Sequence, residues 1–403
     1  MRVLHVAPDL SRAFGGPTEA LLGFVAAARA AGIETEVIGP MPPAEDLAWF
    51  ERRAAGTPVH AFAASGPGSA RLSSGLLRFL ATRGSSFDVV HVHGMFNAIS
   101  TLSARACRRR NIPYVIGPFG TLSRYTFEHK RQLVKRAWHA LLDAPAIRGA
   151  GAMHFTTVHE RDEARRLRAV RGVPAAVVPP PWLPDASGGE QGAAERAIES
   201  PRAGVETVLY LSRLNPIKGL ETLIDAWPAV RVRRPGARLV IAGAGDPAYE
   251  RAIRARAAER VTDGSITFAG FVKGAEKARL LAEADVFALT SYHENFGVAV
   301  IEAIAAGLPA VITPEVQVSD VVVEHALGTV VPRAPAEVAR GIVATLEDSA
   351  LRARVASVGP QLIPALYTLD SVGERLRAMY ELAIEGVPVP RMEGTKLDTP
   401  TPA

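Results

Sequence analysis

The sequence predicts a protein of two doubly wound α/β domains, and three observations lead to this prediction. Short apolar runs alternate with longer segments of helical periodicity in both halves of the chain. The chain has 403 residues, which is too long for one ordinary core and suits two domains of about 150 to 200 residues each. Residues 183–204 are rich in Gly, Ser, Ala and charged side chains, so we expect a linker there.

Strand and helix patterns follow one another along both halves of the chain. In the first half the expected strands cover residues 3–7, 35–38, 89–92 and 114–116, with helices over 18–31 and 98–110. In the second half the expected strands cover 208–211, 239–242, 266–269, 286–289 and 310–312, with helices over 220–230, 249–260, 276–283 and 298–306. A last helix is expected over 370–384. Because such alternation builds a mostly parallel sheet with helices on both faces, each half is expected to form one domain, with a cleft between them.

These patterns also give the expected domain boundaries. The first domain covers residues 1–182, the linker 183–204 and the second domain 205–369. Residues 387–403 have little apolar content, and we expect this tail to be disordered.

Composition narrows the class of protein. Hydrophobic residues make up 48% of the chain and charged residues 22%, as in ordinary globular proteins. The single cysteine, Cys107, excludes a disulfide framework and fits a reducing cytoplasm. Pro8 and Asp9 interrupt the first apolar run, which therefore reads as a strand and not as a signal peptide. The net charge of +5 is compatible with anionic ligands or an anionic membrane surface, and without a recognised module we expect no nucleic-acid partner.

The most informative stretch is 291–313, SYHENFGVAVIEAIAAGLPAVIT. It places Glu294 in the loop between an apolar strand and the next helix, the edge at which open α/β sheets bind ligands. Glu302 lies more than a full turn into that helix, where a bare carboxylate among apolar residues would be costly to bury. Hydrogen bonds to vicinal hydroxyls, such as those of a ribose, would solve that problem. Taken alone, the two glutamates fit an ordinary loop and a solvated helix position equally well.

The start of the same helix is a second candidate site. Asn295, Phe296 and Gly297 open it, and the free N–H groups of a first helical turn attract anions, of which a diphosphate is the obvious one. Arg213 and Lys218, in the stretch LSRLNPIKGL, follow another strand and flank the start of the next helix. Two cations at such a junction can clamp a diphosphate, although ordinary surface cations would look the same.

The motif Glu294-Asn-Phe-Gly, followed by Glu302-Ala and by Ala-Gly-Leu-Pro at 306–309, resembles the E-x7-E signature of retaining glycosyltransferases of the GT-B fold, specifically family 4. The resemblance implies two Rossmann-like domains facing a cleft, with a helix over 370–386 that crosses back to the first domain. It also implies a nucleoside-diphosphate sugar (UDP- or GDP-linked) bound by the second domain and an acceptor bound by the first. The spacing of Arg213 and Lys218 is similar to the family's donor diphosphate site.

The resemblance assigns further donor-binding positions. Gly15 and Gly16 follow the first strand and are similar to the glycine loop that faces the donor phosphates. Gly243 lies in a G-x-G turn, and Val272 follows the next strand; the corresponding positions of the family line the nucleotide pocket. Taken by itself, the turn at Gly243 would also suit a dinucleotide oxidoreductase, but it lacks the third glycine of that fingerprint.

On the acceptor side, His93 ends the strand in the stretch VVHVHG, where it could face the cleft or be structural. Phe119 stands where many members of the resembled family carry a histidine, and that histidine's role is not transferred to this chain. The pattern of HVHG, PYVIGPFGTL and the HFTT run at 154–157 looks like transferases that build exopolysaccharide, capsule or lipopolysaccharide.

Residues 123–142 form a candidate basic amphipathic helix, with Phe127, Val134, Trp138 and Leu141 on one face. Such a helix can lie on anionic lipid, or it can simply pack with a solvated basic face. Members of the resembled family that act on lipid-linked sugars dock on membranes in this way, so peripheral contact with the inner face of the cytoplasmic membrane is one expectation. The spacing of Cys, His and Asp residues predicts no metal site, and we expect no metal or other cofactor.

The resemblance therefore implies a metal-independent, retaining enzyme that moves a sugar to a hydroxyl of a glycan or lipid-linked acceptor. Glu294, Arg213 and Lys218 are its expected catalytic residues. The expected substrate-binding residues are Gly15, Gly16, His93, Gly243, Val272, Asn295, Phe296, Gly297 and Glu302. Two alternatives stay open: a non-catalytic subunit that binds a nucleotide sugar, and another GT-B enzyme such as a sugar-nucleotide epimerase.

Overall fold

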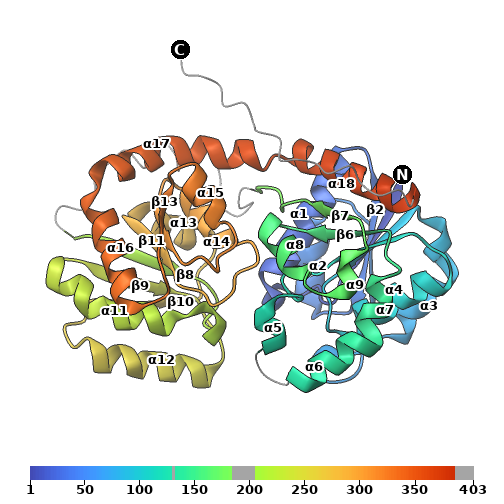
Figure 1. Cartoon of the computed structure of the whole chain (residues 1–403), viewed down its shortest axis with the longest axis horizontal. Coiled ribbons are helices and arrows are strands. Elements are labelled where there is room, and N and C mark those ends of the chain that lie inside the picture. Colours follow the sequence, from blue (N-terminus) through green and yellow to red (C-terminus); the bar gives the residue numbers. More distant parts are fainter. Residues whose placement is uncertain (129–131, 184–204, 386–403) are drawn as a thin grey trace, which may run out of the picture. The chain divides into compact units, whose positions relative to one another are not determined.

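The structure is a computed structural model that describes residues 1–128, 132–183 and 205–385. The tail expected over 387–403 lies outside the described residues, as does nearly all of the linker expected over 183–204. Contacts divide the chain into two compact units (Figure 1). Unit 1 comprises Met1–Val178 and Leu369–Ala403, and unit 2 comprises Pro179–Thr368.

Unit 1 contains a seven-stranded sheet in the order β3-β2-β1-β4-β5-β6-β7, in which all neighbouring strands are parallel. Its strands are β1 Arg2–Val6, β2 Glu34–Pro40, β3 Val59–Phe62, β4 Val89–His93, β5 Tyr114–Gly117, β6 Ala152–Phe155 and β7 Ala175–Val177. Its helices are α1 Gly16–Ala30, α2 Ala44–Arg53, α3 Ser74–Arg83, α4 Ala98–Arg109, α5 Arg124–Glu128, α6 Gln132–Trp138, α7 Ala144–Ile147, α8 Val158–Ala164, α9 Arg168–Arg171 and α18 Leu369–Glu385. Short 3-10 turns lie at Arg12–Phe14, Gly68–Ala70 and Gly84–Ser86.

The sheet of unit 1 is buried on both faces. Successive side chains of each strand point to opposite faces, and each face packs against its own set of helices. Leu4 and Val6 of β1 belong to a core cluster with α3 and α4, whereas Val3 belongs to a separate cluster with α1 and α18. A sheet whose two faces are both covered needs strands that are apolar at nearly every position, and β5 has no charged residue and is buried throughout. This burial explains why short continuous apolar runs were sufficient to predict its central strands.

Unit 2 contains a six-stranded parallel sheet in the order β10-β9-β8-β11-β12-β13. Its strands are β8 Thr207–Leu211, β9 Arg238–Ala242, β10 Ile266–Gly270, β11 Val286–Leu289, β12 Ala310–Ile312 and β13 Gly328–Val330. Its helices are α11 Leu220–Arg233, α12 Pro247–Arg260, α13 Gly274–Glu283, α14 Val298–Ala305, α15 Ser319–Glu324, α16 Pro335–Glu347 and α17 Ser349–Leu366, with a 3-10 turn at Pro216–Lys218. One large core cluster, which includes the fully buried Trp227, joins these elements.

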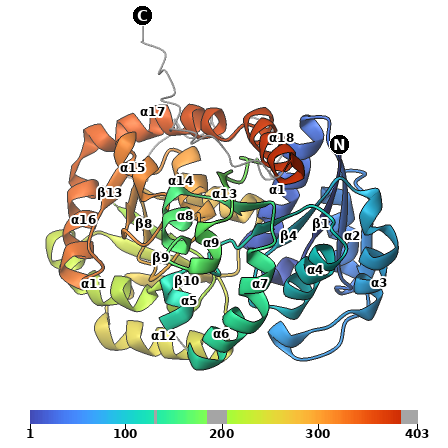
Figure 2. The same cartoon turned by 45° about the vertical axis from the view of Figure 1, so that its right-hand side comes forward.

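The helix α18 follows α17 in sequence but belongs to unit 1, where it packs along α1 (Figures 1 and 2). Gly373 allows the close approach of the two helices, because a Cβ atom there would lie 2.3 Å from the carbonyl oxygen of Ala27. The Arg377 guanidinium donates to the carbonyl of Ala31 just beyond the end of α1. Tyr380 of α18 is fully buried against the sheet.

The predicted fold class is confirmed, and each predicted strand is present. No sequence pattern predicted the strands β3, β6, β7 and β13 or the helices α2, α3, α8, α9 and α15 to α17. All four of these strands have only three or four residues, and β3, β7 and β13 contain no fully buried position. Weak burial leaves little hydrophobic periodicity to detect in a single sequence.

The basic segment over 123–142 is helical in most of its described residues. The structure describes α5, α6 and a π-helical turn, His139–Asp143, that leads into α7, while residues 129–131 are outside the described part. Pro145 lacks the N–H that would continue the α-helical ladder, and the carbonyl of Leu141 accepts from Arg105 at 3.1 Å instead. Two side chains of the expected apolar face, Val134 and Leu141, are 62% and 71% exposed, so they are not part of the core of unit 1.

Candidate functional site

The candidate donor site lies at the carboxyl edge of the unit 2 sheet, where the strand order reverses. Strands β8 and β11 are neighbours in the sheet, but the chain leaves them in opposite directions, toward β9 and toward β12. Ligands of doubly wound sheets bind in the crevice at such a switch point. The loop after β8 carries Arg213 and Lys218, and the loop after β11 carries Glu294. The residues predicted to be catalytic therefore occupy the two loops that flank this point.

Lys218 and Glu294 form an ion pair between these loops. The side chains are only 12% and 19% exposed, so the pair is largely shielded from water but open to a ligand. Partial burial strengthens the interaction of two charges relative to a solvated surface pair. The structure thus joins two residues that the sequence analysis assigned to the site on separate motifs.

Backbone contacts hold the two loops against each other. The Thr290 hydroxyl donates to the carbonyl of Gly219 at 2.8 Å, and the N–H of Tyr292 donates to the carbonyl of Ile217 at 2.7 Å. Gly219 has a φ of 61°, and a Cβ atom at this position would lie 2.1 Å from the carbonyl oxygen of Thr290. Only glycine fits there without displacing the loop. The position of Lys218 beside Glu294 is therefore set by close backbone packing.

The Glu294 loop is fixed on its other side by the loop after β12. The N–H of Glu294 donates to the carbonyl of Glu315 at 3.0 Å, and the N–H of Gln317 donates to the carbonyl of Glu294 at 3.1 Å. Phe296 is 8% exposed and packs edge-on against Tyr367, with ring centroids 5.5 Å apart. Phe296, predicted to bind substrate, is thus mainly a buried anchor of the loop.

The helix α14 begins without a side-chain cap. Gly297 is its N-cap residue, with a φ of 80°, and within the described part of the chain no side-chain hydrogen bond caps this start. Asn295 precedes this start in the same loop. Uncapped N–H groups and the helix dipole favour an anion at this place. Together with the Lys218 ammonium, this helix start makes the switch point of unit 2 electrostatically suited to a diphosphate.

Arg213 is exposed, and among the described residues it makes no ion pair or hydrogen bond. Its neighbour Leu214 is buried and is fixed by a 2.9 Å backbone hydrogen bond to Ala244. The Arg213 guanidinium is therefore a cation on a fixed backbone at the edge of the site, and all five of its donors remain available.

Glu302 has a protein partner that the sequence analysis did not identify. Its carboxylate lies 2.6 Å from the ammonium of Lys277 on α13, with exposed side-chain fractions of 20% and 16%. The ion pair explains how a carboxylate is tolerated on the otherwise apolar helix α14. Lys277 has no local sequence signal, because the lysine and the glutamate are brought together only by the packing of α13 near α14.

Gly243 and Val272 shape the neighbouring part of the same edge. A Cβ atom at Gly243, whose φ is 145°, would lie 1.9 Å from the carbonyl oxygen of Ser212. The glycine thus lets the loop after β9 press against the loop after β8. Val272 is 6% exposed and belongs to the core cluster, so it lines the interior more than an open pocket.

In unit 1 the predicted residues again flank the point where the strand order reverses, here between β1 and β4. Gly15, with a φ of 74°, is the N-cap residue of α1, and the described residues place no side-chain cap on this helix. Gly16 is exposed, and a Cβ atom there would meet nothing within 4 Å. His93 is the last residue of β4 and is 4% exposed, so only a small part of it reaches the surface.

His93 belongs to a buried group of four imidazoles that the sequence analysis missed. His5, His91 and His154 are fully buried beside it, on β1, β4 and β6. Burial lowers the pKa of His5 to about 3 and of His154 to about 4, and it lowers the pKa of His91 and of His93 well below 6.5. All four are therefore neutral near pH 7.

Phe119 packs over this group of histidines. Its φ is 48°, and its ring lies above Gly117, where a Cβ atom would come within 2.4 Å of the ring. The ring centroid lies 5.3 Å from that of His93 and 5.1 Å from that of His154. Phe119 therefore shields the imidazoles from water.

Three of these histidines could in principle hold a metal ion. One nitrogen each of His5, His91 and His93 lie within 4.8 Å of one another, and three imidazoles are a known zinc ligand set. No local pattern predicts this group, because the side chains come from two strands that are far apart in the chain. The absence of a metal requirement stays a prediction.

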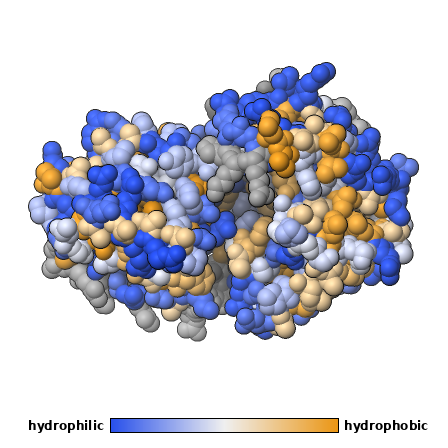
Figure 3. Space-filling view, turned by 90° about the horizontal axis from the view of Figure 1, so that it is seen from below, coloured by the Kyte–Doolittle hydropathy of each residue, from blue (hydrophilic) through white to orange (hydrophobic). Residues whose placement is uncertain are grey.

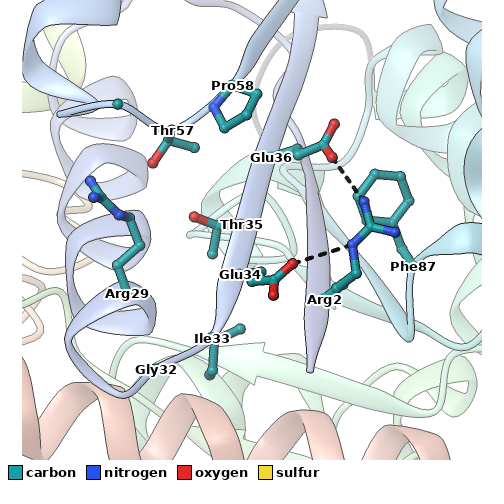
Figure 4. Close-up of a pocket in the computed structure, with 11 residues that line it drawn as sticks. Arg2, Arg29, Gly32, Ile33, Glu34, Thr35, Glu36, Thr57, Pro58 and Phe87 are labelled. Carbon is teal, nitrogen blue, oxygen red and sulfur yellow. Dashed lines mark hydrogen bonds and ion pairs between the residues drawn. The ribbon is translucent and has the colours of Figure 1, made fainter.

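A separate cavity of about 430 Å³ opens at the amino ends of β1 and β2 (Figure 4). Arg2 lies between two carboxylates there, 3.5 Å from Glu34 and 3.2 Å from Glu36. Its charges are thus paired within the protein, and it lies at the sheet edge opposite the switch point.

Among the described residues, no helix is both long and apolar enough to cross a membrane.

Comparisons with known proteins agree with this architecture. Residues 15–181 match the family of the glycosyl transferase 4-like domain, and residues 193–361 match glycosyl transferases group 1. The phosphatidyl-myo-inositol mannosyltransferase of Mycobacterium leprae is 28% identical over 387 residues, 94% of this chain and 96% of that protein. A glycosyltransferase of Methanocaldococcus jannaschii is 30% identical over 186 residues, but this match spans only 44% of this chain and 45% of that protein.

Among solved structures, HepE of Anabaena in complex with UDP and glucose superimposes with a TM-score of 0.72. The two share 19% sequence identity, and the match covers 94% of this chain and 99% of HepE. At this identity the likeness concerns the fold, which is GT-B in both. The two family models together span both units, and the chain belongs to the family 4 glycosyltransferases of the GT-B fold.

Proposed function

We propose that the protein transfers a sugar from a nucleoside-diphosphate sugar to a hydroxyl group of an acceptor, with retention of the anomeric configuration. The observation that carries the proposal is the Lys218–Glu294 ion pair at the switch point of unit 2, next to the uncapped start of α14. A cation, a carboxylate and a helix N-terminus in one place suit a ligand that carries both a diphosphate and sugar hydroxyls.

The leaving diphosphate gains negative charge as its bond to the sugar breaks. The Lys218 ammonium, the Arg213 guanidinium and the first-turn N–H groups of α14 would stabilise that charge, and preorganised electrostatic stabilisation of this kind is usually the largest contribution to catalysis. Lys218 is paired with Glu294 in the structure. On binding, the diphosphate would replace Glu294 as the partner of Lys218, so the charge of Lys218 would not be left unpaired. Glu294 would then accept hydrogen bonds from hydroxyls of the donor sugar.

Glu302 is proposed to hold the ribose hydroxyls, with Lys277 fixing its orientation. The 2.6 Å pair directs the carboxylate, and one carboxylate can accept from a lysine and from a hydroxyl at the same time. Gly243 lets its loop pack against the loop of Arg213, and this packing would hold the two loops together beside the nucleotide. No group of unit 2 is needed as a covalent nucleophile, since the leaving phosphate can take the acceptor proton in a front-side substitution. No metal ion is required, because cations of the chain carry the diphosphate.

The base is proposed to be uracil or guanine. HepE was solved in complex with UDP and glucose, and the Mycobacterium leprae relative is named as a mannosyltransferase.

The acceptor is proposed to be a glycan or a lipid-linked sugar of surface polysaccharide synthesis. Peripheral contact with an anionic membrane would bring such an acceptor to unit 1. Leu133, Val134 and Leu141 around α6 support this idea, since they are 80%, 62% and 71% exposed. Apolar side chains also reach the surface on the side of the molecule where α6 lies (Figure 3).

The first test is thermal stabilisation of the protein by a panel of nucleotides and nucleotide sugars. A ligand at 100 times its Kd should stabilise by about 2.7 kcal/mol. We expect one uridine or guanosine diphosphate sugar to act, and Glu302→Gln to weaken its effect. The matched control is Glu283→Gln, which removes a different ion pair of α13, the one with Arg279 at 3.1 Å. If no nucleotide sugar stabilises the protein, the donor site is wrong.

Turnover distinguishes an enzyme from a binding subunit. With the donor identified, the protein is incubated with lipid-linked and free glycan acceptors, and the product is analysed by NMR. The coupling constant of the new anomeric proton reports retention or inversion. Stabilisation by a donor without transfer to any acceptor would favour the non-catalytic binding subunit, and inversion would overturn the proposed front-side mechanism.

A further inference from the structure

The four buried histidines of unit 1 form hydrogen bonds that determine where each proton resides. We call His5, His91, His93 and His154 the histidine cluster. They come from three strands of one sheet, and their side chains exclude solvent almost completely, with exposed fractions of 0%, 0%, 4% and 0%. Because a neutral imidazole carries one N–H and one bare nitrogen, each hydrogen bond restricts the next.

The first chain of hydrogen bonds begins at a carbonyl, which can only accept. His154 Nε2 lies 2.7 Å from the carbonyl oxygen of Val178, so this nitrogen carries the proton. His154 Nδ1 is then bare and accepts from His91 Nε2 at 3.2 Å. His91 Nδ1 is bare in turn and accepts from the hydroxyl of Tyr380 at 3.0 Å. Both nitrogens of each ring are used, which fixes the ring orientations as well as the tautomers.

The second hydrogen bond joins His5 Nδ1 and His93 Nε2 at 3.0 Å. Either nitrogen could donate, but His5 Nε2 is buried and has no partner among the described residues. If His93 donated, the neutral His5 would carry its proton on this unpartnered nitrogen. A buried N–H without an acceptor is less favourable than a bare nitrogen without a donor. His5 Nδ1 therefore donates to His93 Nε2, and His93 carries its own proton on Nδ1.

The surroundings keep these imidazoles uncharged. Phe24 stacks on Phe119 with ring centroids 5.7 Å apart, and both lie against the histidine cluster. The hydroxyl of Tyr380 completes the contacts from α18, and its pKa is raised by burial. Burial lowers the pKa of every histidine of the cluster. Among the residues that the structure describes, no carboxylate forms a hydrogen bond or ion pair with the rings, so no neighbouring negative charge favours an imidazolium ion.

We infer that His93 is a fixed, neutral hydrogen-bond donor that offers its Nδ1–H to an oxygen atom of a bound sugar, and that His5 is the residue that positions it. His93 ends β4 at the switch point of unit 1, and it alone in the cluster keeps some exposure. Its Nδ1 has no partner among the described residues and is not fully buried. The inference rests on the proposed function for the identity of the ligand, but not for the tautomer.

This assignment excludes two other roles of His93. A general base needs a bare nitrogen toward the substrate, and the bare nitrogen of His93 already accepts from His5. A metal site at His5, His91 and His93 would need a bare nitrogen from each, but His91 Nδ1 already accepts from Tyr380 and its Nε2 is protonated. The base that takes the acceptor proton must therefore be another group. This agrees with the proposal that the leaving phosphate takes that proton.

The tautomers can be measured on the full chain without any substrate. In protein labelled with ¹⁵N histidine, long-range correlation spectra separate protonated from bare ring nitrogens at pH 7. We expect Nε2–H for His91 and His154 and Nδ1–H for His5 and His93. An Nε2–H signal or a charged ring for His93 would overturn the inference, and so would stoichiometric zinc bound by the three imidazoles.

Substitution of His5 tests its positioning role. His5→Asn keeps an amide donor near the place of Nδ1, whereas His5→Leu removes the donor. We expect His93 to stay in the Nδ1–H form in the first variant and to shift toward Nε2–H in the second. An unchanged His93 spectrum in folded His5→Leu would contradict the role of His5. This spectrum is read without ligand, so it does not depend on the proposed activity.

Substitution of His93 tests the donor role. His93→Asn places an amide donor where Nδ1–H was, and His93→Gln places it toward His5. We expect sugar transfer by the glutamine variant to fall about tenfold or more below that of the asparagine variant, the effect of losing one hydrogen bond in the transition state. Stabilisation by the nucleotide, which binds unit 2, should be equal in both. Equal transfer rates in the two variants would overturn the donor role of His93. If the nucleotide fails to stabilise even the wild-type protein, that result counts against the proposed function instead.

Discussion

Lys218 and Glu294 are 76 residues apart in sequence, and the structure pairs their charges at the point where the strand order of unit 2 reverses. The pair is mostly buried, and its two loops are joined through Gly219 and Thr290. In the proposed function, a ligand with a diphosphate takes the place of Glu294 as the partner of Lys218. In the structure the two charges compensate each other.

Lys218→Ala should lower the rate of sugar transfer strongly and the stability of the fold only modestly. Loss of one electrostatic contact to the leaving group typically lowers kcat about 10² to 10³-fold. The variant also leaves Glu294 without its lysine, so we expect a modest loss of stability. Enzyme assays and urea unfolding measure the two effects, and a double-mutant cycle with Glu294→Gln isolates the pair. Arg340→Ala, which breaks a surface pair with Glu337, is the control. Unchanged kcat in Lys218→Ala would refute its catalytic role.

Gly219→Ala should destabilise unit 2 strongly, because a Cβ atom there would lie 2.1 Å from the carbonyl of Thr290. Gly264→Ala is a matched control in the same unit: its φ is 73°, close to the 61° of Gly219, but a Cβ atom meets nothing within 4 Å. We expect about 1 kcal/mol of loss for Gly264→Ala from backbone strain alone, and at least about 2 kcal/mol more for Gly219→Ala. Equal losses in urea unfolding would show that the close loop packing is not what requires this glycine.

The histidine cluster should make unit 1 sensitive to acid. The pKa of His5 is lowered to about 3 and that of His154 to about 4, whereas an unfolded histidine titrates near 6.5. The unfolded state therefore binds more protons below pH 6.5, and the free energy of unfolding should fall as the pH drops toward these folded-state values. Each buried histidine contributes a slope of up to about 1.4 kcal/mol per pH unit.

Urea unfolding at a series of pH values measures this slope. His154→Gln should lower the slope by the amount that corresponds to about one proton taken up on unfolding. His60→Gln, which changes a histidine outside the cluster, serves as the comparison. Stability that stays constant from pH 7 to pH 5 would show that the cluster is already hydrated or charged in the native state.

Asp143→Asn should stabilise the protein at alkaline pH and have little effect in acid. Asp143 is buried, and its Oδ1 accepts from the Thr101 hydroxyl at 2.6 Å and from the Trp138 indole at 3.2 Å. Burial raises its pKa to about 6. Because the folded-state value is raised, the stability associated with the protonated form is present at low pH and lost as the pH rises through about 6.

Asparagine keeps the oxygen that accepts both hydrogen bonds and removes the charge. We expect a gain of about 1 to 3 kcal/mol at pH 8 and nearly none at pH 4, measured by urea unfolding at both values. A gain of the same size at both pH values would mean that the charge of Asp143 is not the cause.

The proposed membrane contact depends on the exposed apolar side chains around α6. Leu133→Ser combined with Val134→Ser should weaken binding to vesicles that contain anionic lipid, because these side chains are 80% and 62% exposed. Val232→Ser removes an equally exposed side chain, at 80%, from unit 2 and should have no effect. Vesicle co-sedimentation measures both variants. Equal binding by the wild-type protein and the double variant would exclude this surface as the contact.

The sequence by itself determined the features that depend on neighbours along the chain. The apolar run of β11, the loop at Glu294, the glycine start of α14 and its end at Gly307 were predictable because each follows from local periodicity and backbone preference. The same reasoning placed Lys218 at a helix start and His93 at a strand end. It also gave the fold class, since buried parallel strands leave continuous apolar runs.

Only the tertiary structure decided which of these residues meet. The order of the strands brings β8 next to β11 and β1 next to β4, and no local pattern encodes that order. Lys218 therefore finds Glu294, Lys277 finds Glu302, and His5 finds His93 across 88 residues. Ion pairing, burial and the choice of tautomer are properties of such non-local neighbours. The chemical state of these side chains follows from packing, because desolvation and hydrogen bonding act only once the chain is folded.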